Sequence, residues 1–205
     1  MRSLTFTRSL VCGIVLLGSL ITPLFAAPKV GMDAPDFSLT DIDGQPRSLR
    51  DFRGKTVVLE WVNPECPFVK KHYESGNMPR LQKEAAEEGV IWLSINSGHA
   101  GAQGDFEPSK VVEWQDRTGA VPTAYMRDQS GSVGRLYDAK TTPHIFVINP
   151  EGVLVYEGAI DSIRSANPRD IGQAENYVTS SLRAVSEGRM PDKTTSEPYG
   201  CTVKY

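Results

Sequence analysis

The chain has 205 residues, of which 40% are hydrophobic and 23% are charged. These values are ordinary for a globular protein and exclude a disordered or collagen-like chain. The 22 basic and 25 acidic residues give a formal net charge of -3, which provides no basic footprint for a nucleic acid partner. Three cysteines are too few for a disulfide-stapled scaffold, and their odd number predicts one unpaired thiol.

The first 26 residues have the pattern of a cleaved secretory signal peptide. An apolar run over residues 10–25 follows two arginines, and small residues stand where a signal peptidase would cut. The run is shorter than the about 20 apolar residues that span a bilayer, although an uncleaved anchor is the alternative. Cleavage removes Cys12 and leaves the even pair of Cys66 and Cys201. We therefore expect an exported or periplasmic protein without membrane attachment, in a compartment where disulfides persist.

The first part of the mature chain predicts strands. Residues 36–39 and 45–49 are expected to form a short hairpin, because an Asp-Gly turn signal lies between them. Residues 55–62 are β-branched and nearly all apolar, and residues 90–95 are similar, so each is expected to form a strand buried on both faces. The helical pattern between them implies a parallel pair with a right-handed crossover.

That helical pattern begins at Cys66, and Gly76 and Pro79 predict a break within it. The elements expected after it are a loop over 96–107, a helix over 108–117, a strand over 123–126, a short helix over 132–137, an antiparallel hairpin of 145–148 and 153–156, and a helix over 171–185. The sequence thus predicts one α/β domain over residues 27–188, with a central mixed sheet flanked by helices. A polar tail over residues 189–205 carries Cys201.

Cys66 has the local setting of a reactive thiol, because it follows a buried strand and starts a helix. The free N–H groups and the positive end of the helix dipole favour the thiolate. In such a place a thiol pKa of ~8.5 falls toward ~3.5–7.5, and Lys70 and Lys71 add positive charge nearby. A buried structural cysteine is the alternative. Flanking prolines and the lack of an apolar period through Cys66 favour a functional role.

Two segments connect this cysteine with a known fold. Residues 61–72 lead a strand into the cysteine-bearing helix, and Thr142-Pro143 stands just before the final hairpin. The chain resembles the thioredoxin superfamily, in which a cis-proline at that place faces the active cysteine. It is most similar to the exported peroxiredoxin-like (AhpC/TSA-type) group, whose pattern looks like Cys66-Pro67-Phe68-Val69, Thr142-Pro143-His144 and the ending Tyr199-Gly200-Cys201-Thr202-Val203-Lys204-Tyr205.

The resemblance covers almost all of the mature chain. It implies a thioredoxin fold with an N-terminal β extension, in which Cys66 is the nucleophile and Pro143 orients the substrate. Pro67 and Thr142 stand next to them as supporting residues.

The chain departs from the patterns of both related groups. Val69 stands where the second cysteine of a thioredoxin Cys-x-x-Cys motif would be, so Cys66 has no local partner. A peroxiredoxin would have Pro and Thr or Ser where this chain has Leu59 and Asn63. The hydroxyl that would orient a peroxide is therefore missing from its usual place.

Cys201 is the candidate resolving thiol. A thiolate that attacks a disulfide forms a mixed disulfide, and a second thiol must release it. Gly200 beside Cys201 permits a close approach of the backbone. Two alternatives stay open, namely a static Cys66–Cys201 staple and two thiols that never meet.

Three further side chains are candidates for supporting roles. His144 follows the proline loop, where it would tune the Cys66 thiolate or bind a soft metal such as Cu(I), with simple packing as the alternative. Glu60 is either a buried carboxylate that moves protons, as in thioredoxins, or a solvated edge residue. Trp61 is expected in the core or lining a groove. His72 points to a different face of an ideal helix from Cys66, so no metal site is assigned there.

We therefore expect an exported thiol–disulfide oxidoreductase that needs no cofactor. Its partners would be a protein or small-molecule disulfide and a thiol reductant, and not nucleic acid. One alternative is a thiol peroxidase that reduces hydroperoxides at Cys66. The other is a non-enzymatic periplasmic module that handles metal or haem.

Overall fold

The central sheet of the molecule has five strands in the order β5-β4-β3-β7-β8. The computed structural model describes residues 27–205, so the predicted signal peptide lies outside the described residues. β3 runs parallel to β4, and β4 runs parallel to β5. β7 is antiparallel to both β3 and β8. The strands are β3 (Val57–Trp61), β4 (Ile91–Asn96), β5 (Ala124–Arg127), β7 (His144–Ile148) and β8 (Leu154–Gly158).

β3 lies in the middle of this sheet, and all five of its residues are buried. A strand covered on both faces needs apolar side chains on both sides, which explains its nearly continuous apolar sequence. The predicted buried strands and their parallel pairing are confirmed. β3 therefore ends inside the molecule, and the chain that follows it enters α1 at Cys66.

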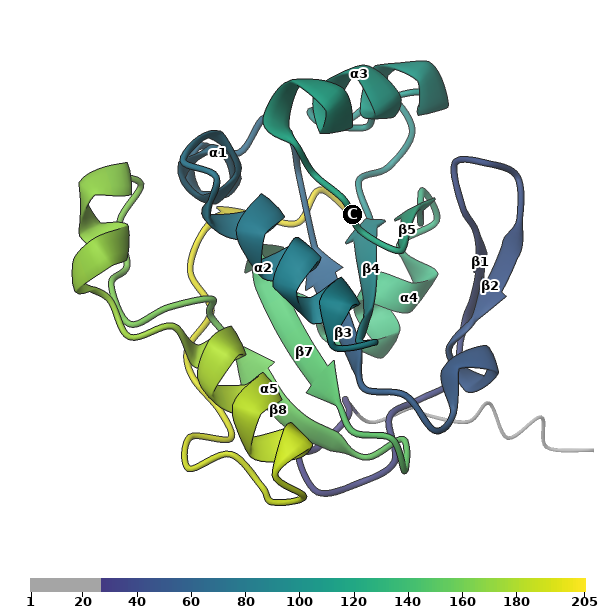
Figure 1. Ribbon diagram of the computed structural model, residues 1–205. Helices are drawn as coiled ribbons and strands as arrows, with labels where there is room; N and C mark the ends of the chain where they lie inside the picture. The colour runs from purple at the N-terminus through teal and green to yellow at the C-terminus, as the bar shows by residue number, and fades with distance from the viewer. Residues whose placement is uncertain (1–26) are drawn as a thin grey trace, which may run out of the picture.

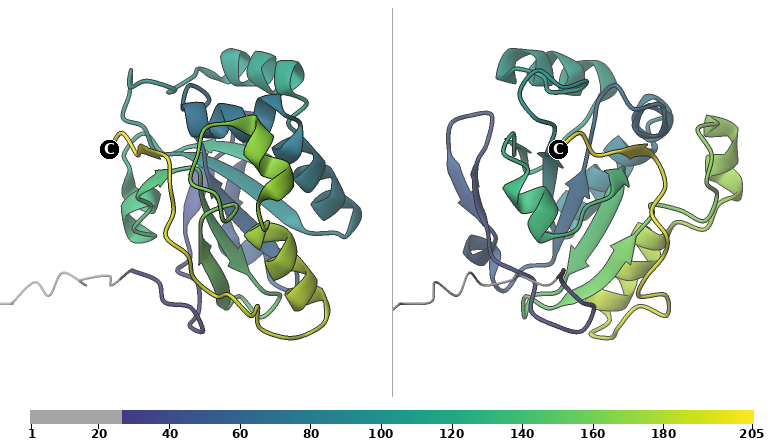
Figure 2. Two further views of the ribbon diagram at one scale, coloured as in Figure 1. Left: turned by 90° about the vertical axis from the view of Figure 1, so that its left-hand side faces the viewer. Right: turned by 180° about the vertical axis from the view of Figure 1, so that it is seen from behind.

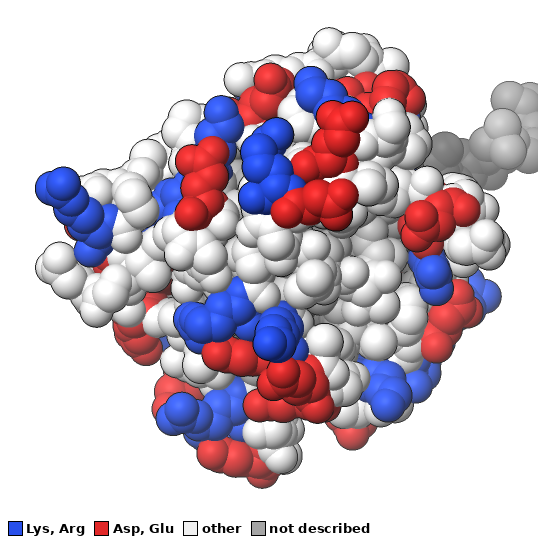
Figure 3. Space-filling view, turned by 45° about the horizontal axis from the view of Figure 1, so that its top comes forward, with Lys and Arg blue, Asp and Glu red and all other residues white. Residues whose placement is uncertain are grey.

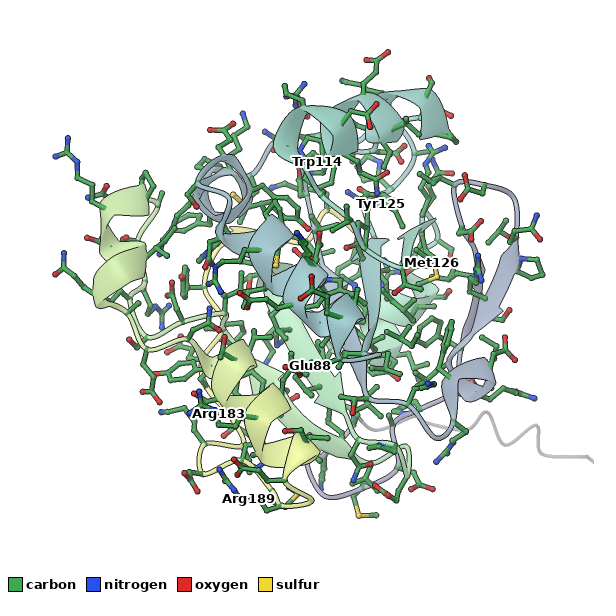
Figure 4. All side chains as sticks on the ribbon, in the orientation of Figure 1. Glu88, Trp114, Tyr125, Met126, Arg183 and Arg189 are labelled. Carbon is green, nitrogen blue, oxygen red and sulfur yellow. The ribbon has the colours of Figure 1, made fainter. Side chains whose placement is uncertain are left out.

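Helices cover both faces of the sheet (Figure 1). One apolar core joins the sheet to four helices, and Trp114 and Tyr125 belong to it (Figure 4). These helices are α1 (Pro67–Glu74), α2 (Asn77–Glu87), α3 (Pro108–Thr118) and α5 (Tyr177–Ser186). The core on the other face is closed by α4 (Ser132–Leu136), by η1 (Leu49–Phe52) and by the hairpin of β1 (Ser38–Thr40) and β2 (Pro46–Ser48).

The predicted N-terminal hairpin is confirmed, with β1 (Ser38–Thr40) antiparallel to β2 (Pro46–Ser48). It lies beside β5, where the amide of Ile42 donates to the carbonyl of Tyr125 at 3.0 Å. The N-terminal β extension thus sits at the edge of the central sheet, away from β8.

Two helix boundaries differ in detail from the expectation. The predicted break is at Gly76, which adopts φ 76° between α1 and α2, whereas Pro79 lies inside α2. The helix predicted over 171–185 is two elements, a 3-10 helix η2 (Pro168–Gln173) and α5. Asn176 separates them, because its side chain caps α5 by accepting the amide of Thr179 at 3.0 Å.

The C-terminal tail contains a short strand that the sequence did not predict. Its strand β9 (Cys201–Thr202) pairs antiparallel with β6 (Thr141–Thr142). Figure 2 shows the tail running from the α5 end of the molecule across to the loops near α4. The tail therefore returns to the end of the sheet where α1 begins.

Basic and acidic side chains are interspersed on the face shown in Figure 3. Across residues 27–205, no helix combines the length and the apolar character that crossing a bilayer requires.

Candidate active site around Cys66

Cys66 occupies the turn between β3 and α1, where it is the N-cap residue of the helix. Its carbonyl accepts the first helical hydrogen bond, from the amide of Lys70 at 2.9 Å. Pro67 is the first helical residue, a position that tolerates proline because its N–H would have no helical partner. The side chain of Cys66 is fully buried.

The thiol of Cys66 points at the loop before β7. Its Sγ donates to the carbonyl oxygen of Thr142 at 3.0 Å, and the Thr142–Pro143 peptide bond is cis. The structure therefore brings the two segments of the superfamily resemblance into direct contact.

Cys201 lies beside the same loop. It is the register partner of Thr142 in the β6–β9 pair, and the Thr142 hydroxyl donates to the Cys201 carbonyl at 3.5 Å. Burial and a hydrogen bond to Cys66 raise the pKa of the Cys201 thiol to about 12. Both cysteines are free thiols. The two thiols thus lie side by side, and Cys201 keeps its proton next to Cys66.

Gly200 makes this approach of the tail sterically allowed. Its φ is 148°, and a Cβ atom there would lie 2.1 Å from the carbonyl oxygen of Thr142. Only glycine fits between the tail and the loop at this point.

Glu60 is a buried carboxylate inside the central strand, which excludes the alternative of a solvated edge residue. Its oxygens accept hydrogen bonds at 2.8–3.2 Å from the indole of Trp92 and the hydroxyls of Tyr73 and Ser94. Burial outweighs these bonds and raises the pKa of Glu60 to about 7. Glu60 can therefore gain or lose a proton near neutral pH.

His144 and Trp61 belong to the opposite face of the sheet from Cys66. Trp61 packs with Phe146 in the second core, and its indole donates to Ser97 at 3.0 Å. The His144 ring lies against Phe146 with the ring centroids 4.5 Å apart and the planes tilted by 43°, and its Nδ1 accepts the amide of Lys140 at 3.3 Å. Burial lowers the pKa of His144 to about 3, so the ring is neutral.

His144 is thus a packing residue in this arrangement, because the sheet separates it from the Cys66 side. Among residues 27–205, no group of three or more His, Cys, Asp or Glu side chains is placed to hold a metal ion.

Sequence reasoning missed a buried polar cluster behind Cys66. We call it the Tyr199 cluster, and its members are Lys71, His72, Asn77, Asp161 and Tyr199. Lys71 was expected to add positive charge near Cys66, but it is buried and pairs with Asp161 at 3.2 Å. The only hint of this cluster in the sequence is Lys71 itself, a charged residue among the side chains that α1 buries.

Asn63 occupies the place of the missing peroxide-orienting hydroxyl. Its side chain donates to the carbonyl of Gln103 at 3.0 Å and accepts the amide of Glu65 at 2.9 Å. Asn63 thus ties the loop after β4 to the start of α1.

Comparisons with known proteins agree with this arrangement. Thiol-disulfide oxidoreductase ResA from Bacillus subtilis is 30% identical over 125 residues, which cover 61% of this chain and 64% of that protein. A hypothetical protein from Sinorhizobium meliloti is 26% identical in sequence, and its structure superposes with a TM-score of 0.73 over 88% of this chain and 96% of that chain.

A putative thiol:disulfide interchange protein DsbE from Chlorobium tepidum shares the fold, with 22% identity and a TM-score of 0.52 over 64% of this chain and 85% of that chain. The mixed five-stranded sheet with its flanking helices is accordingly a thioredoxin fold. The AhpC/TSA family model matches residues 30–157, a stretch that contains β3, Cys66 and the cis-proline loop. Because this match spans more than half of the sequence, the chain belongs to the AhpC/TSA family of the thioredoxin superfamily.

Proposed function

We propose that this protein is an exported thiol–disulfide oxidoreductase in which Cys66 is the nucleophile and Cys201 is the resolving thiol. The observation that carries the proposal is the shared contact of both cysteines with Thr142. The similarity to relatives named thiol-disulfide oxidoreductase supports an oxidoreductase enzyme. The predicted signal peptide supports export.

The chemistry follows from the positions of the two thiols. The Cys66 thiolate attacks one sulfur of a substrate disulfide, which forms a mixed disulfide and releases the other substrate sulfur as a thiol. Cys201 then loses its proton and attacks the Cys66 sulfur. This step forms the Cys66–Cys201 disulfide and releases the second substrate thiol, so the substrate gains two electrons. A thiol reductant returns both cysteines to the reduced state.

Glu60 is assigned the proton transfer that these steps require. It lies in the sheet on the same side as Cys66, and the hydroxyl of Tyr73 in α1 bonds to it. Pro143 and Thr142 form the loop that holds the substrate sulfur in line with Cys66. His144 and Trp61 support this loop from the other face of the sheet.

The geometry favours a disulfide over a hydroperoxide as the substrate. The Asn63 side chain stands where the peroxide-orienting hydroxyl would be, and its hydrogen bonds go to the carbonyl of Gln103 and the amide of Glu65. A thiol peroxidase that acts at Cys66 is the alternative function, and the experiments below distinguish it from the oxidoreductase.

Replacing each cysteine by serine tests the proposal. Cys66→Ser should abolish reduction of a model disulfide, here insulin with dithiothreitol as reductant. Cys201→Ser should accumulate a mixed disulfide at Cys66, because the resolving thiol is absent. Mass spectrometry of the non-reduced protein detects the adduct.

The same Cys201→Ser variant, treated with hydrogen peroxide, provides the contrasting measurement. Rapid formation of a sulfenic acid at Cys66 without any exchange with disulfides would establish the peroxidase and reject the oxidoreductase. Activity that persists in Cys66→Ser would reject both.

A further inference from the structure

The tail that carries Cys201 also covers Cys66. Cys66 is fully buried, and Cys201 and Tyr199 pack in the same apolar cluster around it. A substrate disulfide cannot reach a sulfur that is enclosed in this way. The tail must therefore leave its docked position before attack and return to it for resolution.

Tyr199 fixes the tail two residues before Cys201. Its hydroxyl donates to Asp161 Oδ1 at 2.5 Å and accepts a hydrogen bond from Lys71 Nζ at 3.2 Å. Lys71 Nζ also lies 3.2 Å from Asp161 Oδ2. All three side chains come from segments distant in sequence, since Lys71 belongs to α1, Asp161 follows β8 and Tyr199 belongs to the tail.

His72 provides the third hydrogen bond of the Tyr199 hydroxyl. The side-chain amide nitrogen Nδ2 of Asn77 lies 2.9 Å from His72 Nδ1, so that Nδ1 is the acceptor and Nε2 carries the ring proton. Nε2 lies 3.4 Å from the Tyr199 oxygen and donates to it. The hydroxyl thus donates once and accepts twice, and every polar atom of this enclosed group has a partner.

The charges of the cluster make these bonds strong. Lys71 and Asp161 are both buried, and a hydrogen bond to a charged group contributes more than one between neutral groups. Burial and the bond to Asp161 raise the pKa of Tyr199 well above its ordinary value, so its hydroxyl remains a donor. When the tail leaves, Lys71 and Asp161 lose this partner.

We propose that Lys71 and Asp161 are positioning residues that hold the Tyr199 hydroxyl, and thereby dock Cys201 against Cys66 and keep Cys66 covered. The role in resolution rests on the proposed function, whereas the covering of Cys66 does not. Without the hydrogen bonds of the Tyr199 hydroxyl, the tail should leave its docked position more often, so Cys66 should be exposed for a larger fraction of the time. The return of Cys201 to Cys66 should also be slower.

Tyr199→Phe removes only the hydroxyl and keeps the ring that contacts Phe68, whose centroid lies 5.9 Å away. In the reduced full-length protein, iodoacetamide should alkylate Cys66 about tenfold faster than in the wild type, the factor that a loss of ~1.4 kcal/mol gives. With glutathione disulfide, the mixed disulfide at Cys66 should persist longer before the Cys66–Cys201 disulfide replaces it. Mass spectrometry of quenched samples measures both rates.

Tyr125→Phe is the matched control. Tyr125 is also buried, but its hydroxyl has no hydrogen-bond partner among the described residues, so this variant should behave like the wild type. Gly200→Ala should reproduce the effect of Tyr199→Phe by a different route, because its Cβ would strike the Thr142 carbonyl.

Two outcomes would overturn the proposal. One is an unchanged alkylation rate in a Tyr199→Phe protein whose urea unfolding shows that it is folded. The other is a shifted midpoint in the pH profile of alkylation, which would mean that the hydroxyl changes the acidity of Cys66 rather than its exposure. If Cys66 exchanges with no disulfide at all, the proposed function fails, and the alkylation result still decides the covering role of the tail.

Discussion

At the scale of single residues, burial decides the protonation of the carboxylate beneath α1. Glu60 accepts hydrogen bonds from three side chains, yet burial still raises its pKa to about 7. The same physical effect keeps His144 neutral, because burial lowers its pKa to about 3. One sheet thus holds a carboxylate that titrates near neutral pH and a histidine that does not.

The raised pKa of Glu60 predicts a pH dependence of stability. The ordinary pKa is 4.5 and the folded value is about 7, so the folded state binds more protons between these values. The contribution of Glu60 to the free energy of unfolding should therefore be fully present below pH 4.5 and should be lost as the pH rises through about 7, by on the order of 3 kcal/mol. Urea unfolding at a series of pH values measures this slope.

Glu60→Gln should remove this contribution, so that between these two pH values the variant gains stability relative to the wild type, even if the amide lowers stability at every pH. Glu113→Gln is the control, because Glu113 is exposed and its loss should leave the slope intact. Equal slopes in Glu60→Gln and the wild type would contradict the assignment.

At the scale of elements, the break between α1 and α2 turns the chain back over the sheet. Gly76 makes this break with φ 76°, a conformation that costs a residue with a Cβ about 1–2 kcal/mol. Gly76→Ala should therefore lower the free energy of unfolding by about 1–2 kcal/mol.

Gly172→Ala is the matched control for this prediction. A Cβ at either glycine would meet no atom within 4 Å, but only Gly76 has a positive φ. Gly172→Ala should be neutral or slightly stabilising. Equal losses in thermal or urea unfolding of the two variants would show that backbone conformation is not the cause.

At the scale of the whole molecule, the two cysteines lie at the beginning of α1 and in the C-terminal tail, 135 positions apart in the sequence. A Cys66–Cys201 disulfide closes a long loop, which stabilises the folded state by about 4–5 kcal/mol in the chain-entropy model. The oxidised protein should accordingly unfold at a higher urea concentration than the reduced protein. Cys201→Ser should remove the difference, and a difference that survives in this variant would refute the disulfide as its source.

Much of the fold and part of the site were predictable from local patterns. The buried strands, the helix that starts at Cys66 and the hairpin after Pro143 follow from apolar runs and turn residues that lie close together in sequence. The thioredoxin fold and the pairing of Cys66 with the proline loop followed from the family motifs. The helix predicted over 171–185 has the wrong start, because Asn176 caps α5 rather than continuing a helix through this position.

The sequence alone thus determined the strands and the helix that begins after Cys66, and it singled out Cys66 as the candidate nucleophile, since each depends on neighbours within a few residues. Only the tertiary structure decided where the tail lies, which face His144 occupies and how deeply Glu60 is buried. Lys71 and Tyr199 are 128 positions apart, and no local period links them. Such contacts form because buried charges and hydroxyls must find partners wherever the folded chain brings them. The cysteine count of the sequence therefore leaves an even pair in the predicted mature chain, and only the folded tail brings Cys201 beside Cys66.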